Sequence, residues 1–247
     1  MLDERVPTTR VLQDKPVIIR RQFLRTPGLL ARRPMLGLAM IVLGSIVFGA
    51  IAISLETNGL LQQWDVPLGN AIHAVALQSP PLTVDAMIFG FYLGEHVIFG
   101  IGILLGLYFI FKKFWPELVM VAVAWAGEGL LWLALSQFFH RARPVFDTPV
   151  WRQMTSPGFP SGHSFSAVMC YGLLAYLLVP MMPTRFGKVL VITFAVAIIL
   201  VIDFSRMFIG DHYLTDVLAG FAVGVAWCGL AYTSVELIFK KRIMDHV

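Results

Sequence analysis

Residues 35–55, MLGLAMIVLGSIVFGAIAISL, form an uncharged apolar stretch that decides the fold class. A helix rises about 1.5 Å per residue, so about 20 such residues cross the roughly 30 Å hydrocarbon core of a bilayer. Five further stretches of this kind follow, at residues 95–111, 116–138, 163–181, 187–207 and 214–238. Backbone polar groups in lipid must pair within their own segment, so the stretches predict helices rather than strands.

The composition supports a membrane protein. Of the 247 residues, 57% are hydrophobic and 14% are charged, against about 25% charged in an average soluble domain. Such a chain is not intrinsically disordered, and the composition argues against a soluble enzyme. The net charge of +4 comes from basic residues near the ends of apolar runs, so we expect membrane topology and no nucleic-acid partner. Cys170 and Cys228 lie within apolar runs and form neither a disulfide framework nor a zinc pattern.

Residues 65–92 are less apolar and predict a different element. Asp65 begins a short helix that Pro80 and Pro81 end, and we expect this helix to lie in the membrane interface. The apolar piece 82–92 either lies in the interface as well or extends the second span. We therefore predict an all-α, polytopic membrane bundle with six transmembrane helices and a short interfacial helix. Residues 1–34 form a basic cytoplasmic tail and residues 35–247 one six-span membrane domain.

Lysine and arginine predict the orientation. With six spans, 15 of the 19 basic residues fall on one side of the membrane, which the positive-inside rule assigns to the cytoplasm. We expect an integral protein of a bacterial cytoplasmic membrane with both termini inside. The basic residues that fall on the outer side need another explanation, and they are Arg141, Arg143, Arg152 and Arg206.

Three short motifs accompany these outer arginines. They read Arg141-Ala-Arg-Pro144, Pro160-Ser-Gly-His163, and Ser205-Arg followed by five residues, a histidine, three residues and Asp216. Planar guanidinium forks match phosphate oxygens, and the free N–H groups of a helix start favour an anion. The sequence thus places phosphate-binding chemistry on one predicted face of the membrane.

The histidines of the motifs add transfer chemistry. His212 and Asp216 are spaced i, i+4, so we expect them to share one helix face. Asp216 can then accept a hydrogen bond from Nδ1–H of His212. That bond leaves Nε2 free as a nucleophile. His163 is a second imidazole that can protonate a leaving oxygen. This set supports phosphoryl transfer through a phosphohistidine and requires no metal and no cofactor.

The three motifs resemble the signature of the type-2 phosphatidic acid phosphatase superfamily, in its integral-membrane branch. That signature reads Lys-x6-Arg-Pro, Pro-Ser-Gly-His and Ser-Arg-x5-His-x3-Asp. The second and third blocks match in full, and the first matches at Arg143-Pro144. The lysine of the first block falls at Ser136, which is a departure from the family.

The resemblance implies roles for individual residues. His212 would be the nucleophile, Asp216 its partner, and His163 the general acid and later the base for water. The phosphate would be held by Arg143, Arg206, Ser161 and the Gly162 amide. Arg141 is a further candidate, as a replacement for the missing lysine.

The expected function is hydrolysis of a phosphate or diphosphate monoester carried on a lipid. Candidate substrates are polyprenyl diphosphate, phosphatidylglycerol phosphate, phosphatidic acid and a lipid A-type phosphate. Membrane lipids are further expected partners, and the sequence leaves the oligomeric state open. Two alternatives stay open: a phosphotransferase that uses the same intermediate, and a catalytically impaired lipid-phosphate-binding protein, which Ser136 suggests.

Three acidic residues outside the motifs have simpler expected roles. Glu128 lies within a span, where a carboxylate is costly and is either paired or functional. Glu95 lies at the outer end of the second span, where we expect an interfacial position. Asp211, next to His212, is expected to be solvated.

Overall fold

The computed structural model describes residue 30 and residues 33–244, and it confirms the predicted all-helical bundle. Six helical segments are long and apolar enough to cross a membrane. The helices are α3 (Pro34–Glu56), α4 (Leu60–Gln63), α5 (Asp65–Gln78), α6 (Pro81–Tyr92), α7 (Ile98–Lys112), α8 (Trp115–Phe139), α9 (Gly162–Leu178), α10 (Arg185–Phe208) and α11 (Leu214–Met244). Most of the predicted tail, residues 1–34, lies outside the described residues.

The second span starts earlier than the sequence predicts. α6, a π-helical turn at Leu93–Val97 (η1) and α7 follow one another without a break, so one span runs from Pro81 to Lys112. Pro81 stands in the first turn of α6, where a missing backbone N–H costs nothing. The apolar piece 82–92 is therefore helical and continuous with the second span, as the second of its two predicted positions requires.

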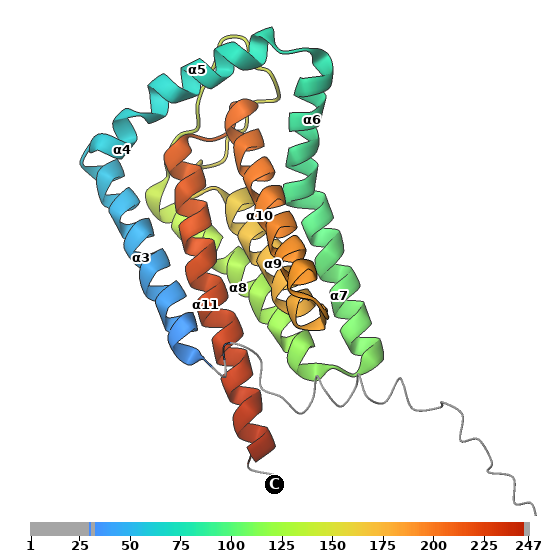
Figure 1. Ribbon diagram of the computed structural model, residues 1–247. Helices are drawn as coiled ribbons and strands as arrows, with labels where there is room; N and C mark the ends of the chain where they lie inside the picture. The colour runs from blue at the N-terminus through green and yellow to red at the C-terminus, as the bar shows by residue number, and fades with distance from the viewer. Residues whose placement is uncertain (1–29, 31–32, 245–247) are drawn as a thin grey trace, which may run out of the picture.

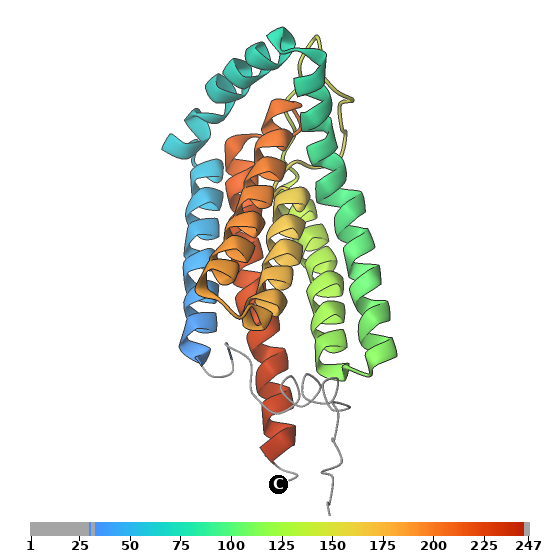
Figure 2. The same ribbon diagram turned by 45° about the vertical axis from the view of Figure 1, so that its right-hand side comes forward.

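α5 crosses one end of the bundle, from α4 beside α3 to the top of α6 (Figures 1 and 2). The long connection from α8 to α9 lies at the same end (Figure 1). The two are in contact, because the rings of His73 in α5 and Phe146 in the connection stack with centroids 3.8 Å apart. Together they cover the end of the bundle where the three motifs lie.

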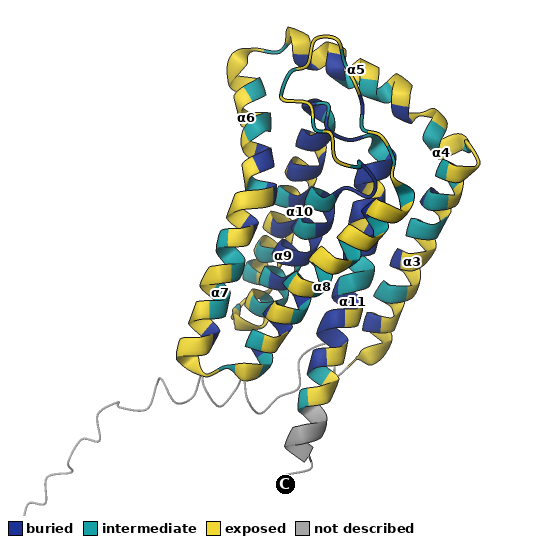
Figure 3. Ribbon diagram, turned by 180° about the vertical axis from the view of Figure 1, so that it is seen from behind, coloured by how far each residue is buried: buried dark blue, intermediate teal, exposed yellow. Residues whose placement is uncertain are grey.

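α9 and α11 form the centre of the bundle, and the other spans surround them (Figure 3). Glycines permit the close approach. A Cβ at Gly220 of α11 would stand 2.4 Å from the Ser161 carbonyl oxygen, and one at Gly44 of α3 would stand 2.6 Å from that of Ala222. Small residues of this kind let membrane helices pack backbone to backbone.

Candidate active site

The start of α9 forms one wall of the site. Ser161 is the N-cap of α9, and its Oγ accepts a hydrogen bond from the Ser164 N–H at 3.4 Å. The Ser161 N–H donates to the Asp216 carbonyl oxygen at 3.0 Å, so the second and third motifs touch. Gly162 begins the helix, where free N–H groups and the helix dipole favour an anion.

His212 is held in one tautomer by its neighbours. Arg143 Nη1 lies 2.8 Å from His212 Nε2, and a guanidinium only donates, so Nε2 is the acceptor. The proton of the neutral imidazole is then on Nδ1, which lies 3.6 Å from Asp216 Oδ2. This is the tautomer that the predicted nucleophile requires, with the lone pair of Nε2 facing a phosphate-binding side chain. The separation of Nδ1 from Asp216 is beyond hydrogen-bond distance, so the predicted hydrogen bond between them is not formed and the contact is one of charge alone.

Asp216 is fully buried and has partners on both oxygens. Oδ2 accepts from the Tyr213 N–H at 2.9 Å, and Oδ1 accepts from Arg141 Nη1 at 2.5 Å. The other Arg141 nitrogen, Nη2, donates to Asp65 Oδ2 at 2.7 Å. The guanidinium of Arg141, a candidate phosphate ligand in the sequence, is thus bound to two carboxylates.

Arg143 and Arg206, the two predicted phosphate-binding arginines, differ in how many of their N–H groups already donate hydrogen bonds within the protein. Arg143 donates from Nε to the Ser156 carbonyl oxygen at 2.9 Å and from Nη1 to that of Asp211 at 3.1 Å. Arg206 is completely buried and forms an ion pair with Asp211. Its Nε and Nη1 have no hydrogen-bond partner among the described residues. A buried guanidinium with unused donors is suited to an anionic ligand.

His163 lies in the first turn of α9, next to the second span. Its ring packs against Phe91 with centroids 4.9 Å apart, and the Arg206 guanidinium lies 4.7 Å from the same Phe91 ring. His163 Nε2 is 3.7 Å from Glu95 Oε2. Phe91 therefore packs against both the predicted acid and a predicted phosphate arginine.

Burial and charge shift the pKa values of the loop residues that flank the site. Burial, reinforced by Arg143 and Arg206, holds the pKa of His212 well below its usual value. Burial also lowers the pKa of Arg143, although Asp211 opposes the shift. The pKa of Asp211 is raised by burial against the opposing charge of Arg206. The neutral, nucleophilic form of His212 is accordingly the form present near neutral pH.

Three acidic residues to which the motifs assign no role make contacts that the sequence did not predict. Asp211 is only 2% exposed and paired with Arg206, so the prediction of a solvated carboxylate is wrong. Glu95 belongs to the π-turn η1 and faces His163. π-Turns within helices often occur at functional sites. Asp65 is 1% exposed and bound to Arg141, and a carboxylate at a helix start carries no sequence signal for such a contact.

Glu128 and Ser136 both have partners within the membrane helices. Glu128 accepts a hydrogen bond from Ser166 Oγ at 2.7 Å, which is the paired alternative of the two expected. Ser136 is buried and donates to the Leu133 carbonyl oxygen at 3.0 Å. Within the described part of the chain, no three His, Cys, Asp or Glu side chains come together as metal ligands would.

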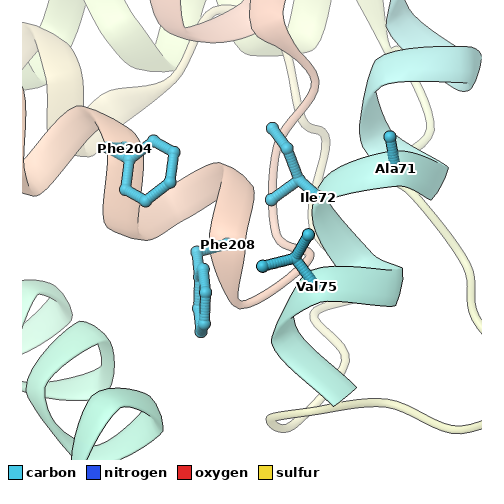
Figure 4. A pocket seen from close by; sticks show the side chains of 5 residues that line it. All are labelled: Ala71, Ile72, Val75, Phe204 and Phe208. Atoms are coloured by element: carbon cyan, nitrogen blue, oxygen red, sulfur yellow. The ribbon is translucent and has the colours of Figure 1, made fainter. Parts of the chain in front are cut away.

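Two hollows lie close to these residues. One of about 440 Å³ opens in the α8–α9 connection, with Arg141, Arg143 and Ser156 in its wall. The other, of about 200 Å³, lies between α5 and α10 and is entirely apolar (Figure 4). Its wall consists of Ala71, Ile72, Val75, Phe204 and Phe208.

An all-helical membrane bundle with this cluster at one end defines an integral-membrane member of a phosphatase superfamily. The model of the PAP2 superfamily matches residues 117–240, and the chain belongs to that superfamily. It is 32% identical over 188 residues to phosphatidylglycerophosphatase B of Bacillus subtilis (strain 168), which covers 73% of this chain and 87% of that protein.

Solved structures agree with this assignment. The bundle is similar to the crystal structure of a transmembrane PAP2-type phosphatidylglycerolphosphate phosphatase from Bacillus subtilis, with a TM-score of 0.62 and 28% identity. That match covers 79% of this chain and 93% of the other. LpxE of Aquifex aeolicus shares the fold at a TM-score of 0.51 and 23% identity, over 69% of this chain and 95% of its own.

Proposed function

We propose that this chain is a membrane phosphatase that removes phosphate from a lipid through a phosphohistidine on His212. The observation that carries the proposal is the 2.8 Å contact between Arg143 Nη1 and His212 Nε2. It makes Nε2 an acceptor next to a phosphate-binding guanidinium. Asp216, on the other side of the ring, can stabilise the charge that the imidazole acquires when it is phosphorylated.

The reaction has two steps. His212 Nε2 attacks phosphorus, the bond from phosphorus to the lipid oxygen breaks, and His163 gives its proton to that oxygen. Water then attacks the phosphorus of the phosphohistidine, His163 takes a proton from the water, and the bond from phosphorus to His212 Nε2 breaks, so that inorganic phosphate leaves and His212 is restored. Arg143, Arg206, Ser161 and the Gly162 amide hold the phosphate oxygens throughout. No metal is needed in either step.

The lipid character of the substrate is supported by the membrane bundle and by the apolar hollow between α5 and α10 (Figure 4). Phe208 in this hollow belongs to the same buried cluster as Phe91, and the Arg206 guanidinium carbon lies 4.7 Å from the Phe91 ring, so hydrocarbon there would lie close to a phosphate arginine. Phosphatidylglycerol phosphate is our first candidate, because a similar protein is a phosphatidylglycerophosphatase. Phosphatidic acid, polyprenyl diphosphate and lipid A-type phosphate complete the panel to be tested.

The test is phosphate release from this panel by purified protein in detergent, with and without a chelator. We expect release that the chelator does not change, and a phosphoenzyme on His212 that is labile in acid. His212→Ala should release no phosphate, and His163→Ala should be slower by roughly 10²–10⁴-fold, the usual contribution of a positioned acid. Full activity of well-folded His212→Ala protein would falsify the mechanism. Transfer of the phosphate to an added alcohol in preference to water would instead identify a phosphotransferase.

A further inference from the structure

Asp65, at the start of α5, is buried and accepts hydrogen bonds on both carboxylate oxygens. Oδ1 accepts from the Thr215 N–H at 3.0 Å, and Oδ2 accepts from Thr215 Oγ1 and from Arg141 Nη2. Thr215 directly precedes Asp216 in the chain. An interfacial helix, remote in sequence from the motifs, thus reaches the residue next to the partner of the nucleophile.

Arg141 bridges this carboxylate to Asp216. Its Nη1 donates to Asp216 Oδ1 at 2.5 Å while Nη2 donates to Asp65 at 2.7 Å, and the Tyr213 ring lies 4.8 Å from the guanidinium carbon. Burial lowers the pKa of Arg141, but the two carboxylates outweigh burial and raise it. The guanidinium is therefore charged, and Nη1 also donates to Thr215 Oγ1 at 2.7 Å, so both of its terminal nitrogens are in use.

We propose that Asp65 and Arg141 are positioning residues that extend the His212–Asp216 pair into a four-residue chain of alternating charge. The proposal rests on the proposed function, because it concerns the charge that His212 acquires during the reaction. Arg141 fixes the Asp216 carboxylate in place, and Asp65 balances the charge of Arg141.

The charge balance explains why both residues are needed. Arg141 and Asp216 alone would be a neutral pair, and a neutral pair attracts a phosphorylated imidazolium only weakly. With Asp65, two carboxylates share one guanidinium, and the set keeps one negative charge for His212. Asp65 thus lets Asp216 be held rigidly without losing its electrostatic effect on the nucleophile.

The experiment compares three variants in steady-state phosphate release from the lipid phosphate that the wild type hydrolyses fastest. Asp65→Asn keeps the shape of the side chain but removes its charge, so that the new amide, Arg141 and Asp216 together carry no net charge. We expect its kcat to fall by about 10²-fold with KM unchanged, which is less than the roughly 10⁴-fold reported when a comparable carboxylate is neutralised directly. The double variant Asp65→Asn/Arg141→Gln lacks the charges of both Asp65 and Arg141. The negative charge of Asp216 is then no longer offset by a guanidinium. We expect kcat of this double variant to recover most of the loss.

The control is His73→Ala, which loosens α5 against the connection without changing the chain of charges. We expect it to keep the kcat of the wild type. If Asp65 and Arg141 only held Asp216 in place and had no electrostatic role, the double variant would be slower than Asp65→Asn. That order, or a wild-type kcat for Asp65→Asn, overturns the proposal.

Each variant is compared after its thermal unfolding in detergent shows a folded protein. If Asp65→Asn does not fold, the double variant alone decides: activity near that of the wild type supports the charge balance, and an inactive folded protein overturns it. Failure of the proposed function is distinguishable, because it would appear as undiminished phosphate release by His212→Ala.

Discussion

Arg143 has two effects on His212, and they can be separated by pH. Its guanidinium donates to Nε2 of the imidazole, and its charge is one cause of the lowered pKa of His212, after burial. An imidazole must be unprotonated to attack phosphorus, so the acid limb of kcat/KM follows this pKa.

We expect Arg143→Gln to move that acid limb toward higher pH. Removal of the positive charge lets the pKa of His212 rise toward its ordinary value, so protonation inactivates the enzyme at a higher pH than in the wild type. KM should rise as well, because a phosphate ligand is lost. The measurement is kcat/KM for phosphate release across the acidic and neutral range. Arg152→Gln, which removes an exposed arginine of the same connection, should leave the acid limb in place. An unshifted limb in Arg143→Gln would show that Arg143 does not act on His212.

Most of the candidate site could be predicted from residues that lie in motifs, and its supporting residues could not. His163 lies in the first turn of α9, where its motif predicts a helix start. His212 lies 3.6 Å from Asp216, but it precedes α11, so the two do not share a helix face as their i, i+4 spacing predicts. Asp65 bonds to residues that are 76 and 150 positions away, and no local pattern reports such a contact. For the same reason the sequence predicts that the guanidinium of Arg141 is available to bind phosphate, whereas in the structure it is paired with the carboxylates of Asp65 and Asp216.

At the scale of elements, the contact between α9 and α11 sets the position of the phosphate-binding turn. A Cβ on Gly220 would stand 2.4 Å from the Ser161 carbonyl oxygen and 2.9 Å from Ser164 Cβ. The first of these neighbours is backbone, so it cannot turn aside as a flexible side chain would.

We expect Gly220→Ala to push the start of α9 away from α11. Overpacking of this kind costs about 1–3 kcal/mol of stability, and a displacement near 1 Å in a catalytic group can reduce the rate by about 10²-fold. Thermal unfolding in detergent and kcat measure the two effects. Gly49→Ala in α3 is the matched control, because a Cβ there meets no atom within 4 Å. Equal behaviour of the two variants would mean that the helices can separate without disturbing the site.

The π-turn η1 shows why element boundaries were harder to predict than elements. Hydropathy identified the second span, but its start depends on whether Pro81 begins a helix that joins α7. An extra residue in a helical turn changes which side chains face inward, and Glu95 in this turn lies 3.7 Å from His163. Apolar periodicity does not record such a change in helical pitch.

For the whole molecule, the site and the basic connections lie at opposite ends of the bundle. α5 and the α8–α9 connection cover one end, whereas the α7–α8 junction and the start of α10 lie at the other (Figures 1 and 2). The basic residues of that second end are Lys112, Lys113, Arg185 and Lys188. The positive-inside rule predicts that this end faces the cytoplasm and that the site faces away from it.

We expect a membrane-impermeant maleimide to label Thr148→Cys in intact cells and to label Arg185→Cys only after the membrane is opened. Both positions are exposed, and the two native cysteines are buried, so the added thiol is the reactive one. Labelling in opened membranes shows that each thiol is accessible. The reverse pattern would place the site in the cytoplasm.

The six-span fold itself was predictable because lipid, rather than a neighbouring helix, is the main solvent of most spans. Only 17% of the most apolar part of α3 and of α8 is buried within the bundle, against 61% for α11. Apolar residues are therefore required all round the outer helices, and hydropathy detects them without knowledge of the packing. The arrangement of the helices around α9 and α11 depends instead on close approaches at glycines, which carry no signal of their partner.

The pairing of the first span with the last has a consequence for biosynthesis. α3 packs along α11, with Gly37 and Gly229 at the contact, so the bundle closes only when the end of the chain has been inserted. Asp65 can bond to Thr215, and Ser161 at the start of α9 can bond to Asp216, only after α11 is in place. A nascent chain therefore carries the predicted phosphate-binding turn and the predicted acid histidine before it has the predicted nucleophile. On the proposed mechanism, the site is complete only after α11 has docked against α3 and α9.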